Sequence, residues 1–139
     1  MNLPLYWIDA FTDRVFGGNP AAVVPLDSWL DGALLQRIEN ENGLSETAFF
    51  VRTGTARAEL RWFTPAVEVD LCGHATLATA HVLFHELGQV QSPFVFDTKS
   101  GPLSVARRGP LFELDFPSRP AAPAEPPADL LRGLGLKPA

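Results

Sequence analysis

Hydrophobic and polar residues alternate along several short stretches of the chain, which is the pattern of half-buried β-strands. In residues 56–62, for example, four apolar residues alternate with three charged ones. Turns rich in glycine and proline separate these stretches, and the turn at 17–20 joins the first two as a predicted hairpin. The predicted strands are residues 3–11, 21–24, 47–52, 56–63, 93–98, 102–108 and 110–117.

A longer period, typical of an amphipathic α-helix, begins near residue 29 and continues to residue 42. Asp27 or Ser28 is the predicted N-cap, and Gly43 is the predicted end of this helix. The helix is expected to cover one face of the sheet. Its apolar stripe consists of Leu30, Leu34, Leu35 and Ile38.

Residues 73–88 are apolar on nearly every side and end at a glycine. A helix without a polar face belongs inside a protein, so we expect the strands to surround it. The predicted architecture is an α+β fold, in which a strongly curved, mostly antiparallel sheet wraps around this buried helix.

The sequence changes character after residue 117. Residues 118–127 are rich in proline and alanine and read as a linker, and the last residues have room for only about two turns of helix. We therefore predict a domain at 1–117, followed at 118–139 by a linker and the start of a second domain.

Composition and charge narrow the classes of function. The 139 residues are 46% hydrophobic, enough for one domain with a core, and the net charge is −5 with no run of basic residues, which argues against nucleic acid as a partner. No segment is long enough to span a membrane, and the first residues lack the features of a signal peptide, so we expect a soluble, cytoplasmic protein. The single cysteine excludes an internal disulfide.

The first turn of the buried helix is the strongest candidate site. Its unpaired N–H groups and partial positive charge suit a carboxylate or phosphate, and Gly73 permits close approach of a ligand. His74 is either a proton donor or relay, or a capping or core histidine. Cys72 is either a thiolate with a depressed pKa at a helix N-terminus, or a small buried hydrophobic residue.

A second candidate, Glu46, precedes a strand of apolar residues. A carboxylate at the edge of an apolar layer is partly desolvated, which suits it to proton transfer, although a solvated residue at a strand end is the alternative. Ser45 lacks a nearby motif that would make it a nucleophile. His81 and His85 have the spacing of two metal ligands, but no third ligand is evident, so we expect no metal site.

The segments IDAFTDRVFGGNPAAVV, NGLSETAFF, RWFTPAVEVDLCGHATLATAHVL and LFELDFP occur in this order. Together they resemble the amino-terminal half of the PhzF-like phenazine-biosynthesis family over nearly all of residues 5–117. The resemblance implies a diaminopimelate-epimerase-like fold with two similar domains and an active site in the cleft between them. Family members are roughly twice as long, as two ordinary domains require.

The resemblance also implies roles for individual residues. Glu46 matches the family's acid/base, and His74 and Gly73 match the pair that binds a substrate carboxylate and supports proton transfer. The turn containing Asn19 is shared and mainly structural. The predicted catalytic residues are thus Glu46 and His74, and the predicted substrate-binding residues are Gly73, Cys72, Ala75 and Asn19.

The function predicted from the sequence is a cofactor-independent isomerase that moves a proton on a small anionic substrate. It would need a second domain, supplied by a homodimer or by a complementing chain that carries the second half. One alternative is half of a racemase or epimerase that uses Cys72, with its second thiol on another chain. The other is a non-catalytic module that binds a small acid or a protein.

Overall fold

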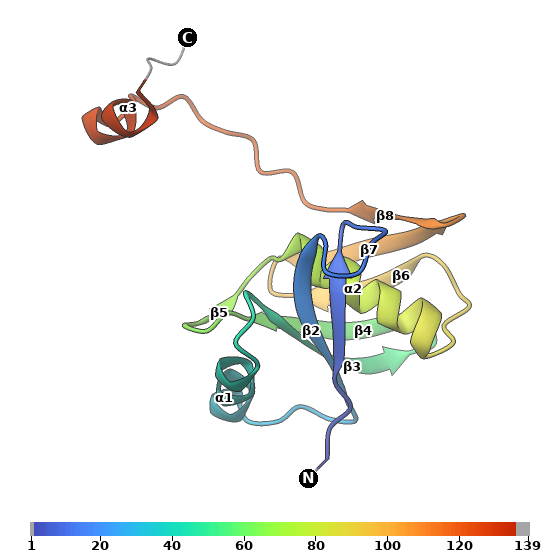
Figure 1. The fold of residues 1–139 in the computed structure, drawn as a ribbon. Helices are drawn as coiled ribbons and strands as arrows, with labels where there is room; N and C mark the ends of the chain where they lie inside the picture. Colours follow the sequence, from blue (N-terminus) through green and yellow to red (C-terminus); the bar gives the residue numbers. More distant parts are fainter. Residues whose placement is uncertain (1, 136–139) are drawn as a thin grey trace.

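The computed structural model describes residues 2–135, in which a strongly curved sheet surrounds a central helix (Figure 1). The strands follow the order β1-β2-β3-β4-β6-β7-β8, with β5 paired to β4. Two of the pairings, β2 with β3 and β4 with β6, are parallel and the rest are antiparallel. The predicted α+β fold is confirmed. The strands are β1 Tyr6–Ala10, β2 Asn19–Leu26, β3 Thr47–Gly54, β4 Arg57–Phe63, β5 Glu68–Val69, β6 Phe94–Thr98, β7 Gly101–Arg108 and β8 Leu111–Asp115.

The predicted hairpin is present as the antiparallel pair β1–β2. Gly18 ends its loop with φ +70°, and a Cβ at this position would collide with the carbonyl oxygen of Ala10. Only glycine fits both requirements without strain. The turn before Asn19 therefore has the structural role that the sequence suggests.

Helix α1 spans Gly32–Asn42 and ends, as predicted, at Gly43, which adopts the left-handed conformation. Its N-cap is Asp31, whose carboxylate accepts a hydrogen bond from Ala33 N at 2.9 Å. The prediction of Asp27 or Ser28 as the cap is wrong, because the chain first turns away from the end of β2 and the helix begins later.

The outer face of the sheet is covered by α1, which links the parallel strands β2 and β3 as a crossover. Leu35 is fully buried against a cluster of apolar residues that is separate from the main core. This cluster also contains Val24, Leu26, Phe49 and Phe63. The predicted amphipathic helix is confirmed.

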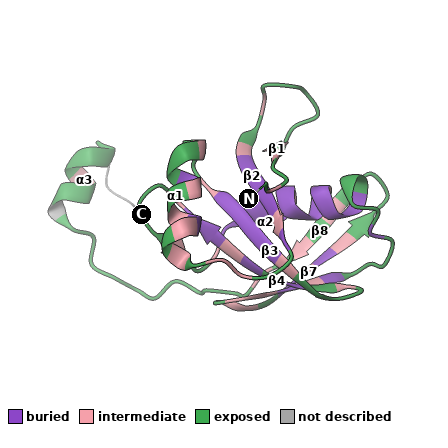
Figure 2. Cartoon of the chain, turned by 90° about the horizontal axis from the view of Figure 1, so that it is seen from below, coloured by how far each residue is buried: buried purple, intermediate pink, exposed green. Residues whose placement is uncertain are grey.

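The central helix α2 spans Gly73–His81 and continues into a π-helical turn at Val82–Glu86. The sequence predicts a single helix up to residue 88, whereas the structure changes from α-helical to π-helical winding after His81. Figure 2 shows α2 buried within the curve of the sheet, as predicted. Six of its nine residues are buried, namely His74, Ala75, Thr76, Ala78, Thr79 and Ala80.

After β8 the chain runs without a helix or strand through residues 116–127 to a short helix, α3, at Ala128–Leu134. In Figure 1 this helix lies apart from the sheet. The remainder of the predicted terminal segment, residues 136–139, lies outside the described residues. Among the helices of residues 2–135, none has the length and apolar character needed to cross a membrane.

Candidate active site

Glu46 is held at the point where the loop after α1 enters β3. Its carbonyl oxygen accepts a hydrogen bond from Ala22 N at 3.3 Å, which ties this residue to the neighbouring strand β2. Thr47, the first residue of β3, is fully buried. The backbone on both sides of Glu46 is therefore fixed, while 20% of its side chain remains exposed.

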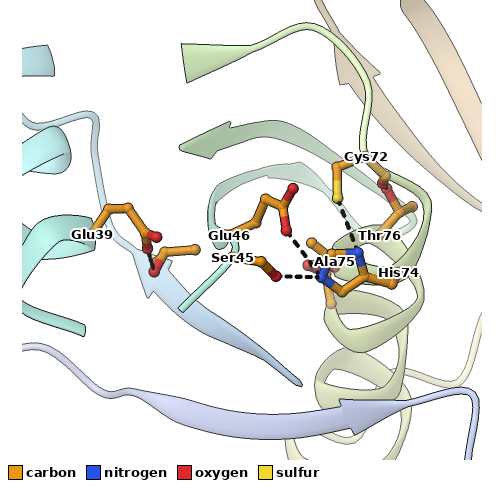
Figure 3. A network of polar contacts seen from close by, with 9 residues as sticks. Glu39, Ser45, Glu46, Cys72, His74, Ala75 and Thr76 are labelled. Atoms are coloured by element: carbon orange, nitrogen blue, oxygen red, sulfur yellow. Dashed lines mark hydrogen bonds and ion pairs between the residues drawn. The ribbon is translucent and has the colours of Figure 1, made fainter. Parts of the chain in front are cut away.

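The carboxylate of Glu46 lies beside the first turn of α2 (Figure 3). Its Oε2 atom is 3.2 Å from His74 Nε2, at ion-pair distance, but this buried oxygen has no well-directed hydrogen bond from the described residues. Ser45 Oγ lies 3.5 Å from the same nitrogen, and Cys72 Sγ lies 3.4 Å from His74 Nδ1. The structure thus brings Glu46, Cys72 and His74 together from two distant parts of the sequence.

Cys72 occupies the N-cap position of α2 and is 7% exposed. Burial raises the pKa of its thiol to about 11, and the negative charge of Glu46 acts in the same direction. The backbone N–H groups of Ala75 and His74 oppose this shift without overcoming it. Burial and the raised pKa thus favour the second interpretation of Cys72, a small buried residue with a neutral thiol, over a thiolate.

The N-terminus of α2 has no side-chain cap. Among residues 2–135 we find no oxygen that accepts from the N–H groups of Gly73, His74 or Ala75. Such a turn attracts an anion through its partial positive charge. The side chain of Ala75 is fully buried, so any contact of this residue with a ligand would use its backbone N–H.

Gly73 lies next to Phe116, which directly follows β8 in the sequence. A Cβ at this position would lie 3.4 Å from Phe116 Cε2, which is an ordinary contact. The backbone angle of Gly73 is not in the left-handed region. Its suggested role in letting a ligand approach therefore stays a prediction.

Asn19 is the predicted site residue that the structure leaves outside the cluster. It is exposed at the start of β2, at the same end of the sheet as Glu46. In the part of the chain that the structure describes, its side chain forms no hydrogen bond to Glu46, Cys72 or His74. Its assignment to substrate binding remains a prediction, whereas its place at the start of β2, directly after the turn, is clear.

Two residues of this region were missed by sequence reasoning. Ser45 was dismissed as a nucleophile, yet its hydroxyl faces the His74 ring. Glu39 was not considered, although it is fully buried on α1 and its carboxylate accepts a hydrogen bond from Thr47 Oγ1. The signal for Glu39 was its position four residues after Leu35, on the buried face of the helix.

The three clustered side chains also have a donor set that suits a metal ion. One ligand atom from each of Glu46, Cys72 and His74 lies within 4.8 Å of the others. However, Cys72 and Glu46 contact different nitrogens of the imidazole, and one metal ion binds only one of these. In this structure the imidazole therefore links the thiol on one side to the carboxylate on the other.

The other histidine pair stacks instead of converging on a point. The rings of His81 and His85 have centroids 4.6 Å apart and are tilted by 32°. Within residues 2–135, no third acidic, cysteine or histidine ligand joins them in a group that could hold a metal ion. Burial and the neighbouring His85 lower the pKa of His81.

Comparison with known proteins places this chain in a family. The sequence profile of phenazine biosynthesis-like proteins matches residues 8–122. An uncharacterized isomerase of Pseudomonas aeruginosa is 56% identical over 137 residues, which are 98% of this chain and 52% of the relative. The chain therefore belongs to the phenazine biosynthesis-like (PhzF) family, as the sequence motifs implied.

Solved structures give the same assignment. A PhzF-family protein from Enterococcus faecalis has a TM-score of 0.87 and 47% identity, covering 99% of this chain and 52% of that one. A predicted epimerase from Pseudomonas aeruginosa has a TM-score of 0.69 and 27% identity, covering 80% and 41% of the two chains. The chain thus spans about half the length of the relatives it matches.

Proposed function

We propose that this chain contributes one half of the active site of an isomerase that moves a proton on a small substrate bearing a carboxylate. The observation that carries the proposal is the Glu46 carboxylate, partly exposed and 3.2 Å from His74 Nε2, beside the uncapped N-terminus of α2. A base, a proton donor and an anion site are the three parts that such a reaction requires.

Glu46 is the proposed base. It removes a proton from a carbon next to an activating group: the C–H bond breaks, the proton goes to a carboxylate oxygen, and the electron pair moves into the conjugated system of the substrate. The proton then returns to a different carbon, so substrate and product have the same composition. No external oxidant, reductant or cofactor is needed for this balance.

His74 and the first turn of α2 are the proposed electrostatic partners of Glu46. The N–H groups of Gly73, His74 and Ala75 would hold the substrate carboxylate, and the imidazole would donate to the oxygen on which charge develops. Preorganised donors are most effective where charge appears during the reaction. The relatives' names as isomerases and the family match support this assignment.

A second domain is the remaining part of the proposal. The chain spans about half of its relatives, and the side chain of Glu46 is still 20% exposed in this half. We propose that a second half, from another copy or from a complementing polypeptide, covers the substrate. A protein that only binds a small acid would share the anion site but would have no need of a base at Glu46.

Replacement of the proposed base tests this function. We expect Glu46→Gln to lower proton exchange by a factor of about 10² to 10⁴, because the amide cannot accept the proton. The measurement is deuterium incorporation from D₂O, followed by NMR, into a panel of small amino and unsaturated carboxylic acids. The assay uses the chain alone and the chain mixed with the second half of its Pseudomonas relative.

Two further variants make this test specific. Glu41→Gln, an exposed change five residues before Glu46, should leave exchange unaltered. Cys72→Ala should also retain most of it, because the thiol is neutral at pH 7. Exchange that survives Glu46→Gln but is lost in Cys72→Ala would replace this proposal with the thiol-dependent racemase. Binding of an acid without exchange in any variant would support a non-catalytic module.

A further inference from the structure

A second carboxyl group lies behind Glu46, and the proposed reaction does not use it. Glu39 belongs to the last turn of α1 and has no solvent exposure. Figure 3 shows it on the side of Glu46 that faces away from His74. A glutamate that is fully buried in a small domain is rare unless it is paired with a cation or a metal.

Hydrogen bonds connect Glu39 to the backbone that carries Glu46. Thr47 Oγ1 donates to Glu39 Oε2, and the same hydroxyl accepts from Asn42 Nδ2 at 2.9 Å. The carbonyl oxygen of Glu39 accepts from Gly43 N at 3.0 Å. Both ends of the short loop from Gly43 to Thr47 are therefore fastened to one residue of α1.

The remaining oxygen of Glu39 indicates its charge. Oε1 is buried and has no hydrogen-bond partner among the described residues. A carboxylate with one neutral donor and one unpaired oxygen is unfavourable in a protein interior, whereas a neutral carboxylic acid costs much less. Burial raises the pKa of Glu39 and the charge of Glu46 raises it further, while the hydrogen bond from Thr47 acts in the opposite direction.

The groups that face Glu39 from the packed elements support the same conclusion. The neutral hydroxyl of Thr47 on β3 donates to Glu39, and this hydroxyl accepts in turn from the neutral amide of Asn42 on α1. The charged group that acts on it is Glu46, which is negative. No basic side chain forms an ion pair with Glu39 within residues 2–135.

We propose that Glu39 is a positioning residue for Glu46, a buried neutral acid that holds the loop carrying the Glu46 carboxylate through Thr47. This inference rests on the proposed role of Glu46 as the base. An uncharged Glu39 places no negative charge next to the Glu46 carboxylate, so it does not repel that carboxylate from its position beside His74.

The titration of the two groups tests this inference without any substrate. In the chain labelled with ¹³C at the glutamate carboxyl carbons, NMR should show Glu39 ionising at a clearly higher pH than Glu41. At the pH where Glu39 ionises, the carboxyl signal of Glu46 should also move, because a new charge appears close to it. In Glu39→Gln this movement should be absent, and in the matched control Glu41→Gln it should remain.

The stability of the folded chain supplies a second measurement. Because the folded pKa of Glu39 lies above its ordinary value of 4.5, the folded state binds the extra proton above that pH. Stability from this group is present at lower pH and is lost as the pH rises through the folded pKa. In urea unfolding from pH 4 to pH 8, the free energy of unfolding of the wild type should therefore fall relative to that of Glu39→Gln.

Two results would overturn the inference. One is ionisation of Glu39 in the wild type together with the exposed Glu41, a result that does not depend on whether Glu39→Gln folds. The other is a Glu46 curve that is identical in the wild type and in Glu39→Gln. Neither result bears on deuterium exchange in the Glu46 variants, so failure of this inference and failure of the proposed reaction are distinguishable.

Discussion

The two longer helices of this domain begin in opposite ways. The N-terminus of α1 is closed by its own sequence, because the Asp31 carboxylate accepts from Ala33 N. The N-terminus of α2 begins at Cys72, which provides no such cap and is buried next to His74. The first turn of α1 is closed by a local carboxylate, whereas the first turn of α2 has only the Cys72 sulfur beside the N–H groups of His74 and Ala75.

The difference in capping follows the difference in burial. On α1 a single stripe is buried, so its ends meet water and a short polar residue completes them. On α2 nearly every side is covered, and its first turn points toward Glu46. An uncapped turn inside a protein is a structural cost unless a ligand or a nearby group uses it. This contrast distinguishes a structural helix end from a functional one.

The largest loss of stability should come from Leu35, the fully buried leucine of α1. We expect Leu35→Ala to lower the free energy of unfolding by about 2–5 kcal/mol, because a fully buried leucine leaves a cavity. Leu34→Ala, the half-buried neighbour, should lose much less. Urea unfolding measures both, and equal losses would contradict the one-sided packing of α1.

A smaller effect should come from the cap of α1. Asp31→Ala should lower the free energy of unfolding by about 1 kcal/mol, because the N–H of Ala33 loses its acceptor. Asp27→Ala is the matched control and should change stability by less than about 0.5 kcal/mol. A loss from Asp27→Ala that exceeds the loss from Asp31→Ala, in thermal or urea unfolding, would mean that Asp27 caps the helix as the sequence suggested.

The smallest effect on stability should come from the first residue of α2. Gly73→Ala should alter the free energy of unfolding by no more than about 1 kcal/mol, since alanine favours helix and its Cβ makes an ordinary contact with Phe116. If Gly73 is where a substrate carboxylate meets the backbone, deuterium exchange should fall while stability does not. Parallel changes in both measurements would assign Gly73 to packing alone.

The strands and the two main helices were predictable because their periods are strong. Residues 56–62 alternate strictly, and β4 buries Ala58, Leu60 and Trp62. Gly43 marked the end of α1 correctly, since a left-handed residue there is a local requirement. These features depend on neighbours in sequence, which is the information that a pattern contains.

Features that depend on distant contacts were less predictable. Three potential caps precede α1, and the choice of Asp31 depends on the path of the chain after β2. The π-helical turn after His81 has no recognisable signal in the sequence. Tertiary packing decides both of these local structures.

The candidate site shows the same division. The motif around Glu46 and His74 suggested that both residues act together, and the structure places them 3.2 Å apart. The sequence left open whether Cys72 is a thiolate or a small buried residue, because burial opposes the effect of the helix N-terminus and only the fold shows which is larger. Glu39 was overlooked because glutamate is usually exposed.

The two ends of the curved sheet have a consequence for the behaviour of the chain in concentrated solution. In the described residues β1 and β8 are the outermost strands, and free strand edges are templates for pairing with other chains. The exposed Glu113 and Asp115 on β8 discourage such pairing through their charge. Both edges expose a large apolar residue, Trp7 on β1 at 57% and Leu111 on β8 at 70%, but β1 lacks an exposed charge, so aggregation should begin at that edge.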